Sequence, residues 1–394
     1  MKKQFIVACT AALVAVLAGG LAQAQPAASQ SVAQEAAREA AQRPARSRPR
    51  TNLVLLGTAG GRTSWNGTPL AGIASALEVD GDVYLVDFGE GWARRYFQAR
   101  LGARFGNQGM AALRAAFITH MHADHVIGYP SLFTFGMTDG LANRKVPMKV
   151  FGPGRRGAPI PIPGPDQTAA GTLVAPGNPN PGTVDMTELV IQTFASDINT
   201  GMREGRKPDP HSLVQAFDIR LPDGLAVDPN AETAPSMEPV LVYEDEKVRV
   251  TAVLVSHAPE FLCFAYRFDT ADGAVVFSGD TGPDKNLVRL ARGADVLVHE
   301  VIDTAWIDSF LPKPRNAGAE AVARHLVHSH TAAEDVGGVA QAAGVKTLVL
   351  NHFGPADASP QRWARAQDGF TGRLIVGNDL MRIGVGAPID GRLP

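Results

Sequence analysis

The segment that most restricts the fold of this 394-residue chain is HMHADH, which directly follows an apolar, strand-like run. In extended backbone, residues two apart point the same way, so His120 and His122 can bind one ion. Asp124 and His125 follow as the chain turns, and they can reach a second ion nearby. Neutral imidazole and carboxylate are good zinc ligands, so the pattern favours a metal site over a chance polar loop.

Three later residues of ligand type strengthen this interpretation. Each of His257, Asp280 and His352 lies at the end of an apolar stretch or just beyond it. Strand ends are where sheets of this kind present their functional residues. Any one of the three, taken alone, is better explained as a capped or satisfied polar residue. Their joint occurrence with the HMHADH segment predicts a metal centre.

Short apolar runs and turn signals predict a chain of alternating strands and helices in two similar halves, and therefore two packed sheets with helices outside. Residues 51–394 are expected to form one domain, with a Gly/Pro-rich insertion or surface loop near 152–184. Strands are predicted at 52–57, 75–79, 83–88, 116–119, 148–151, 240–243, 248–256, 264–268, 274–278, 296–299, 347–350, 374–376 and 381–385. Helices are predicted at 108–115, 186–202, 286–292 and 331–343. The last helix is expected to be capped by Thr331 and ended by Gly344.

The N-terminus has the order of a secretory signal. Lys2 and Lys3 precede an apolar run, and Ala22-Gln23-Ala24 has the small-x-small pattern of a cleavage site. We therefore expect a signal peptide at residues 1–24, a flexible linker at 25–50, a periplasmic or secreted protein and no stable membrane anchor. A transmembrane anchor and a lipid on Cys9 are the alternatives.

Charge and cysteine content bear on the partner and on stability. The 37 basic residues include Lys2 and Lys3, and none of the 39 acidic residues lies in 1–24, so a mature chain has 35 basic residues against 39 acidic ones, or −4. Because binding many phosphates needs a basic surface, nucleic acid is expected to be an unlikely substrate. Only Cys263 remains after cleavage, which excludes an internal disulfide.

With these motifs in view, the chain resembles the metallo-β-lactamase superfamily. Its HxHxDH segment, His257, the SGDT run at 278–281 and His352 occur in the order seen in that family. The opening LLGTAGG, the later LVDFGEG, His299-Glu300 and His330-Thr331 are similar to the tRNase Z and arylsulfatase branch. The resemblance covers nearly all of residues 52–385, and it implies a four-layer αβ/βα sandwich with its site at the sheet edges.

The resemblance also implies roles for individual residues. Two zinc ions (Zn²⁺) per chain are expected, one held by His120, His122 and His257 and the other by Asp124, His125 and His352. Asp280 would contact both ions, and Asp87 would orient a ligand histidine. The expected catalytic residues are Asp124, Glu300 and His330, the last as the group that contacts the substrate or protonates the leaving oxygen. His328 is a rival for that role, while His211 and His325 are expected at the surface.

These expectations combine into an exported dinuclear zinc hydrolase that cleaves phosphodiesters or aryl sulfates by attack of a metal-bound hydroxide. The expected substrate is a small anionic ester, and Arg155 and Arg156 of the insertion are candidates to hold one anion. A homodimer is left open. The alternatives are a lactonase or β-lactamase type of acyl hydrolase, a tRNase Z-like endoribonuclease and a non-catalytic metal carrier.

Overall fold

The computed structural model of the protein describes residues 49–61, 65–160 and 173–386. The predicted signal peptide at 1–24, nearly all of the predicted linker at 25–50 and residues 161–172 of the predicted insertion lie outside the described residues. Across the described ranges, no helix has the length and apolar character needed to cross a membrane.

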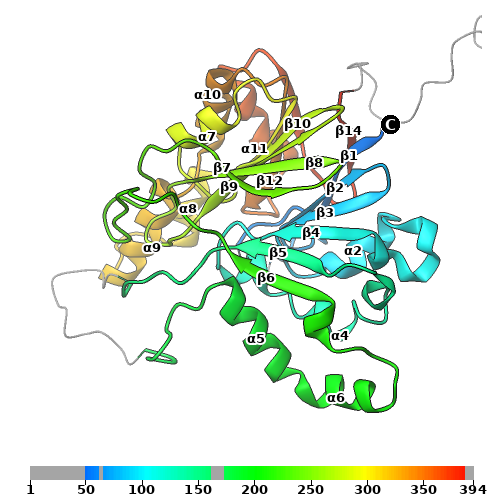
Figure 1. Cartoon of the computed structure of the whole chain (residues 1–394). Coiled ribbons are helices and arrows are strands. Elements are labelled where there is room, and N and C mark those ends of the chain that lie inside the picture. The colour runs from blue at the N-terminus through cyan, green and yellow to red at the C-terminus, as the bar shows by residue number, and fades with distance from the viewer. Residues whose placement is uncertain (1–48, 62–64, 161–172, 387–394) are drawn as a thin grey trace, which may run out of the picture. The chain divides into compact units, whose positions relative to one another are not determined.

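Strands from the N-terminal half form one seven-stranded sheet, which the last strand of the chain completes (Figure 1). Strands β1, β2 and β3 pair antiparallel, whereas β3, β4, β5 and β6 pair in parallel. In spatial order the strands are β14 (Arg382–Gly384), β1 (Thr51–Gly57), β2 (Ala74–Val79), β3 (Asp82–Val86), β4 (Leu113–Phe117), β5 (Met148–Gly152) and β6 (Val214–Asp218).

The C-terminal half builds a second seven-stranded sheet with a closely related order. Four strands, β7 to β10, pair antiparallel, and β10 to β13 run parallel. In spatial order the strands are β13 (Arg373–Val376), β12 (Thr347–Gly354), β11 (Val296–Ile302), β10 (Gly273–Phe277), β9 (Phe264–Thr270), β8 (Val248–Leu254) and β7 (Val240–Glu244).

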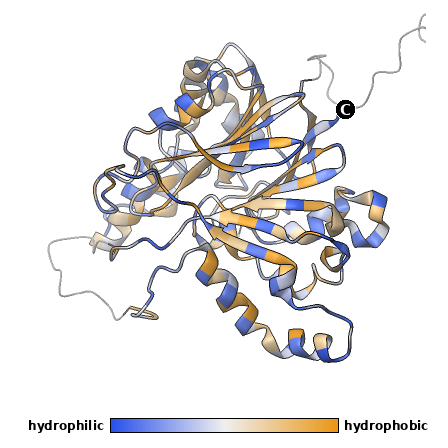
Figure 2. Ribbon diagram, viewed as in Figure 1, coloured by the Kyte–Doolittle hydropathy of each residue, from blue (hydrophilic) through white to orange (hydrophobic). Residues whose placement is uncertain are grey.

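Alternation along the strands explains how the two sheets pack. In β1, Leu53 and Leu55 belong to the core shared with the second sheet, while Val54 and Leu56 belong to the cluster beneath the first sheet's helices. Successive strand residues point to opposite faces, so a strand that is apolar throughout is covered on both sides. Figure 2 shows the resulting concentration of hydrophobic residues along the strands.

Helices cover the outer face of each sheet, which completes the predicted four-layer αβ/βα sandwich (Figure 1). The first half carries α2 (Trp92–Gln98), η1 (Ala103–Ala112), α3 (Ala123–Val126), α4 (Ser131–Thr134), η2 (Leu141–Asn143), α5 (Thr183–Thr193), α6 (Ala195–Arg203) and η4 (Pro210–Ser212). The second half carries α7 (Lys285–Leu290), α8 (Thr304–Phe310), α9 (Ala317–His328), α10 (Ala333–Ala343), α11 (Pro360–Trp363) and η5 (Ala364–Gln367).

Three helix predictions differ from the structure in detail. The helix expected at 186–202 is two helices, α5 and α6, which meet at Phe194. The helix expected at 108–115 is the end of η1, and β4 already begins at Leu113. Thr331 does not cap α10: its hydroxyl donates to the Thr281 carbonyl instead, a partner that only the folded chain supplies. Gly344 does end α10, in the left-handed conformation expected there.

Candidate metal centre

The HMHADH segment lies where β4 leaves the first sheet. His120 and His122 follow the strand, with ring centroids 4.7 Å apart, and α3 then carries Asp124 and His125. The backbone N–H of His125 donates to the His122 carbonyl, which closes the turn. The local backbone therefore presents two histidines before the turn and an acid–histidine pair after it, as the spacing predicts.

The second sheet brings three more residues to the same edge. His257 follows β8 and Asp280 follows β10, whereas His352 lies within β12. The pairing of β11 with β12 shifts its register at His352, which has a φ of 47°. Such a bulge takes the extra residue out of the ladder and redirects its side chain, here toward the first sheet. A Cβ on Gly60 would lie 2.5 Å from the His352 ring, so only glycine permits this approach.

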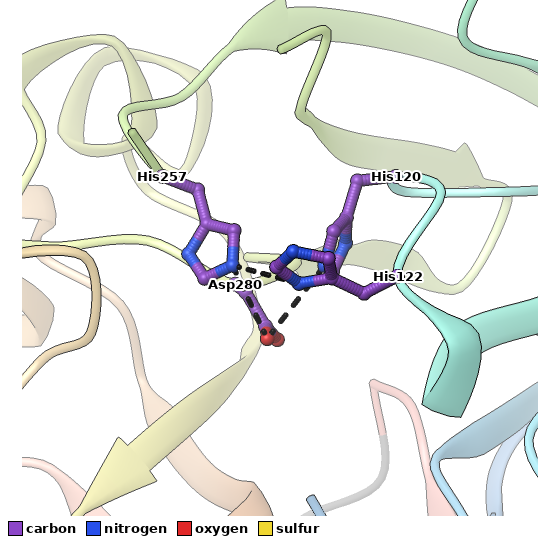
Figure 3. A group of neighbouring side chains, drawn as sticks. All are labelled: His120, His122, His257 and Asp280. Atoms are coloured by element: carbon purple, nitrogen blue, oxygen red, sulfur yellow. Dashed lines mark hydrogen bonds and ion pairs between the residues drawn. The ribbon is translucent and has the colours of Figure 1, made fainter. Parts of the chain in front are cut away.

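His120, His122 and His257, the first cluster, converge with Asp280 (Figure 3). One ligand-type atom from each lies within 4.8 Å of all the others. The His257 Nε2 is 3.2 Å from the His122 Nδ1, and the Asp280 Oδ2 is 3.8 Å from the His120 Nε2. This arrangement of three imidazoles and one carboxylate suits a tetrahedral zinc ion.

Asp124, His125 and His352 form the second cluster, and Asp280 again lies beside it. The His352 Nε2 is 3.1 Å from the Asp124 Oδ2 and 3.2 Å from the Asp280 Oδ2. The His125 Nε2 is 3.4 Å from the Asp280 Oδ1. Asp280 therefore faces both clusters, because its Oδ2 lies near His120 of the first as well as His352 of the second.

Unpaired polar atoms test whether these residues fit a metal. Among the described residues, the buried Nε2 atoms of His120 and His125 and the Oδ1 of Asp280 have no hydrogen-bond partner. Buried polar atoms rarely go unsatisfied, so three of them facing one another indicate a missing common partner. One water molecule can donate to only two of these three atoms, whereas a cation can accept electron pairs from imidazole nitrogens and carboxylate oxygens together, and the residues therefore fit metal binding.

The electrostatics of the two clusters agree with this fit. Burial lowers the pKa of His120 and of His257, which favours the neutral imidazole that binds metals. His125 is also buried, yet Asp280 and the other nearby carboxylates raise its pKa well above the ordinary value. The electrostatic potential around His125 is therefore negative enough to stabilise a proton despite burial. The same negative potential stabilises a divalent cation more strongly, because the cation carries twice the charge.

Each cluster has a partner that orients one of its histidines. The His125 Nδ1–H donates to the Asp87 Oδ2 at 2.9 Å, and Asp87 is fixed in turn by the backbone N–H and hydroxyl of Thr119. The His257 Nδ1–H donates to the Ser329 carbonyl at 2.6 Å. In both cases the Nε2 lone pair is left for a metal. Asp87 thus occupies the orienting position expected from the sequence.

Glu300 and His330 form a pair beside the clusters. The His330 Nδ1–H faces the Glu300 Oε2 at 3.3 Å and lies 4.0 Å from the Asp280 Oδ2. The other Glu300 oxygen accepts from the Thr331 backbone N–H at 2.6 Å. Burial lowers the pKa of His330, but Glu300, Asp280 and Asp124 raise it to about 9. His330 is therefore able to carry a proton at the site, whereas the rival His328 is exposed on α9.

Known proteins share this sequence pattern and this fold. A Beta-lactamase superfamily domain matches residues 212–353. The chain is 26% identical over 320 residues to Ribonuclease Z of Mycobacterium marinum, which covers 80% of this chain and 93% of that protein. It is 29% identical over 321 residues to Ribonuclease Z of Mycolicibacterium paratuberculosis, which covers 81% and 93%. The crystal structure of the short form of human tRNase Z superposes with a TM-score of 0.53 at 18% identity, covering 86% of this chain and 100% of that chain.

The domain match, the ribonuclease Z relatives and the shared fold together support the recognition of this chain as a metallo-β-lactamase superfamily hydrolase. Together with the two clusters, these similarities support a metal-dependent hydrolase, as expected from the sequence. One expectation is overturned: nucleic acid cannot be set aside as an unlikely substrate, because these relatives are named for cleaving RNA. The charge argument is insufficient because net charge is summed over the whole chain, whereas a bound anion meets only the local field of its site.

The structure also corrects what the sequence predicts for three basic residues. Arg155 is paired with Asp185 through two hydrogen bonds of 2.7 and 2.6 Å, so it does not offer a free cation to an anion. Arg156 is buried and donates to the carbonyls of Pro259 and Pro229. His325 was expected at the surface like His211, but its ring lies 4.9 Å from that of His257. No local motif marks His325, because it comes to the site on the separate helix α9.

Proposed function

We propose that this protein is a two-zinc phosphodiesterase that cleaves RNA in the manner its ribonuclease Z relatives are named for. Similarity over about four fifths of the chain supports the RNA substrate, because it spans both halves of the fold. The observation that carries the proposal is the Glu300–His330 pair beside Asp280, at the edge where the two clusters meet. Each cluster is proposed to hold one zinc ion, with Asp280 in contact with both.

When bound, zinc ions in the two clusters would supply activated water and would neutralise charge on the phosphoryl group. The chain holds the ligands in place through Asp87, which orients His125, and through the Ser329 carbonyl, which orients His257. Asp280 sets the spacing of the clusters because its two oxygens face different histidines. The side chains of His120 and His125 are almost fully buried, so bulk water does not reach these two ligands.

His330 is proposed to donate the proton that the leaving oxygen needs. Cleavage of an RNA phosphodiester expels a ribose oxygen, which is a poor leaving group until it is protonated. Glu300 keeps His330 charged and aims its Nδ1–H inward, which leaves Nε2–H for the substrate. Aryl sulfates and nitrophenyl esters expel stable anions and do not require this pair, so its presence favours RNA over the sulfate ester expected from the sequence.

The test is an activity panel on the zinc-loaded full chain. It compares kcat/KM for a precursor tRNA with a 3′ extension, an unstructured RNA, bis(4-nitrophenyl) phosphate, 4-nitrophenyl sulfate and a lactone. We expect both a phosphodiester preference and endonucleolytic cleavage of RNA, lost in Asp280→Asn. A preference for the sulfate or the lactone, with intact RNA, would sink the proposal.

A further inference from the structure

An open pocket, here called the α9 pocket, lies beside the metal centre. It has a volume of about 630 Å³, within the range of small-molecule sites. One wall is formed by helix α9 and the other by two turns, around Pro229-Asn230 and Ala258-Pro259. The pocket reaches the metal centre because His122, whose side chain is 36% exposed, is part of its lining.

The lining combines apolar walls with positive charge. Pro229, Pro259 and Val322 contribute apolar surface, and Arg324 contributes a cation. No acidic residue appears among the described residues that line the pocket with Arg324. The pocket therefore complements a ligand that carries both a flat apolar part and a negative charge.

His325 adds a hydrogen-bond acceptor to this lining. Its Nδ1–H donates to the Ala258 carbonyl at 3.0 Å, so the neutral ring keeps its lone pair on Nε2. The ring lies 5.9 Å from that of His122 and 5.7 Å from that of His330, between the first cluster and the acid. A hydroxyl or amino group that enters the pocket next to the reacting phosphate meets this acceptor.

We propose that the α9 pocket is a nucleotide subsite, which holds the nucleoside next to the scissile phosphate and places its neighbouring phosphate near Arg324. A nucleoside provides the flat apolar base, the hydroxyl and amino donors for His325, and the anion for Arg324. The inference rests on the proposed RNA-cleaving function. It adds which part of the surface recognises the RNA, and it explains how a chain of slightly negative net charge binds a polyanion locally.

Two matched substitutions on α9 test the subsite. Val322 lines the pocket and is 45% exposed, whereas Val327 is 44% exposed on the same helix and outside the pocket. Val322→Glu and Val327→Glu add the same carboxylate to the same helix, and glutamate is a better helix former than valine, so both variants should fold. The measurements are fluorescence anisotropy of a labelled single-stranded hexaribonucleotide and hydrolysis of bis(4-nitrophenyl) phosphate, both with zinc-loaded full chain.

We expect Val322→Glu to weaken RNA binding by about tenfold or more, because the new carboxylate repels the phosphate, while Val327→Glu stays within about twofold of the unsubstituted chain. Val327→Glu should hydrolyse the small diester normally, whereas in Val322→Glu its hydrolysis should fall by much less than RNA binding does, because this diester has no neighbouring phosphate to place near Arg324. Equal RNA binding by the two variants would overturn the subsite, as would an equal loss of small-diester hydrolysis in Val322→Glu. An unsubstituted chain that binds RNA but never cuts it would refute the proposed function alone, and the difference between the variants would still decide the subsite.

Discussion

The two clusters of the metal centre are similar in composition but differ in how they are held. In the first, His257 is oriented by a neutral backbone carbonyl, that of Ser329, and His122 is 36% exposed toward the α9 pocket. In the second, His125 is oriented by a carboxylate, that of Asp87, and is almost fully buried. The difference predicts a division between the clusters, in which the carboxylate partner makes the second hold its ion more tightly and the first opens toward the α9 pocket through His122.

Asp280 is the residue on which this comparison depends, because it faces both clusters. Replacing it with alanine is expected to remove metal from both and to lower kcat/KM on the order of 10³-fold, as for loss of a main source of transition-state charge stabilisation. Metal analysis and RNA cleavage on the same preparation check this. Asp280→Asn keeps the side chain's size and separates loss of charge from loss of packing. Two firmly bound ions in Asp280→Ala would show that the clusters are independent.

His330 belongs to neither cluster, so replacing it should leave metal binding by both clusters unchanged. His330→Ala is expected to keep its metal content and to lose on the order of 10²-fold in RNA cleavage, because the leaving oxygen is no longer protonated. The loss should be much smaller for bis(4-nitrophenyl) phosphate, whose leaving group is a stable anion. His211→Ala, at an exposed histidine remote from the clusters, is the control. Equal losses on both substrates would remove His330 from the acid role.

Asp87→Asn tests whether the carboxylate makes the second cluster the tighter one. We expect one of two zinc ions to bind about 10–100-fold more weakly, the usual effect of losing a partner that orients a ligand. Stepwise competition with a chelator measures each ion. The control is Asp82→Asn, at another buried carboxylate whose partners are Arg104, Arg114 and Lys247 rather than the clusters. If both variants released metal alike, the effect would be one of general stability.

The smallest effect is expected at Arg156, which ties the turn after His257 to the insertion through the Pro259 carbonyl. Arg156→Met should loosen the first cluster only, with zinc affinity reduced by less than about tenfold. Arg155→Met, at the neighbouring exposed residue, is the matched control, because a surface ion pair contributes little. Weakening of the second cluster in Arg156→Met would contradict the division between the clusters.

The local sequence determined a large part of the fold and of the metal centre. The spacing of the HMHADH segment sets the directions of four side chains, because extended backbone has a period of two and the turn that follows is made within the segment. Apolar runs located the described strands other than β6, whose alternating Val214–Asp218 segment was not predicted. The family resemblance indicated the sandwich and pointed to Asp87, Glu300 and His330. Export, with a mature chain beginning at Gln25, stays a prediction of the N-terminal pattern.

Tertiary structure decided what depends on residues far apart in the chain. The bulge that turns His352 inward exists only in the pairing of β11 with β12, and the burial of Arg156 requires carbonyls from two other segments. The α9 pocket, with His325 at its inner end, forms where a helix meets two distant turns. Composition could not reveal the α9 pocket. Net charge is summed over the whole surface, whereas recognition of a ligand depends on the few side chains that face one cavity.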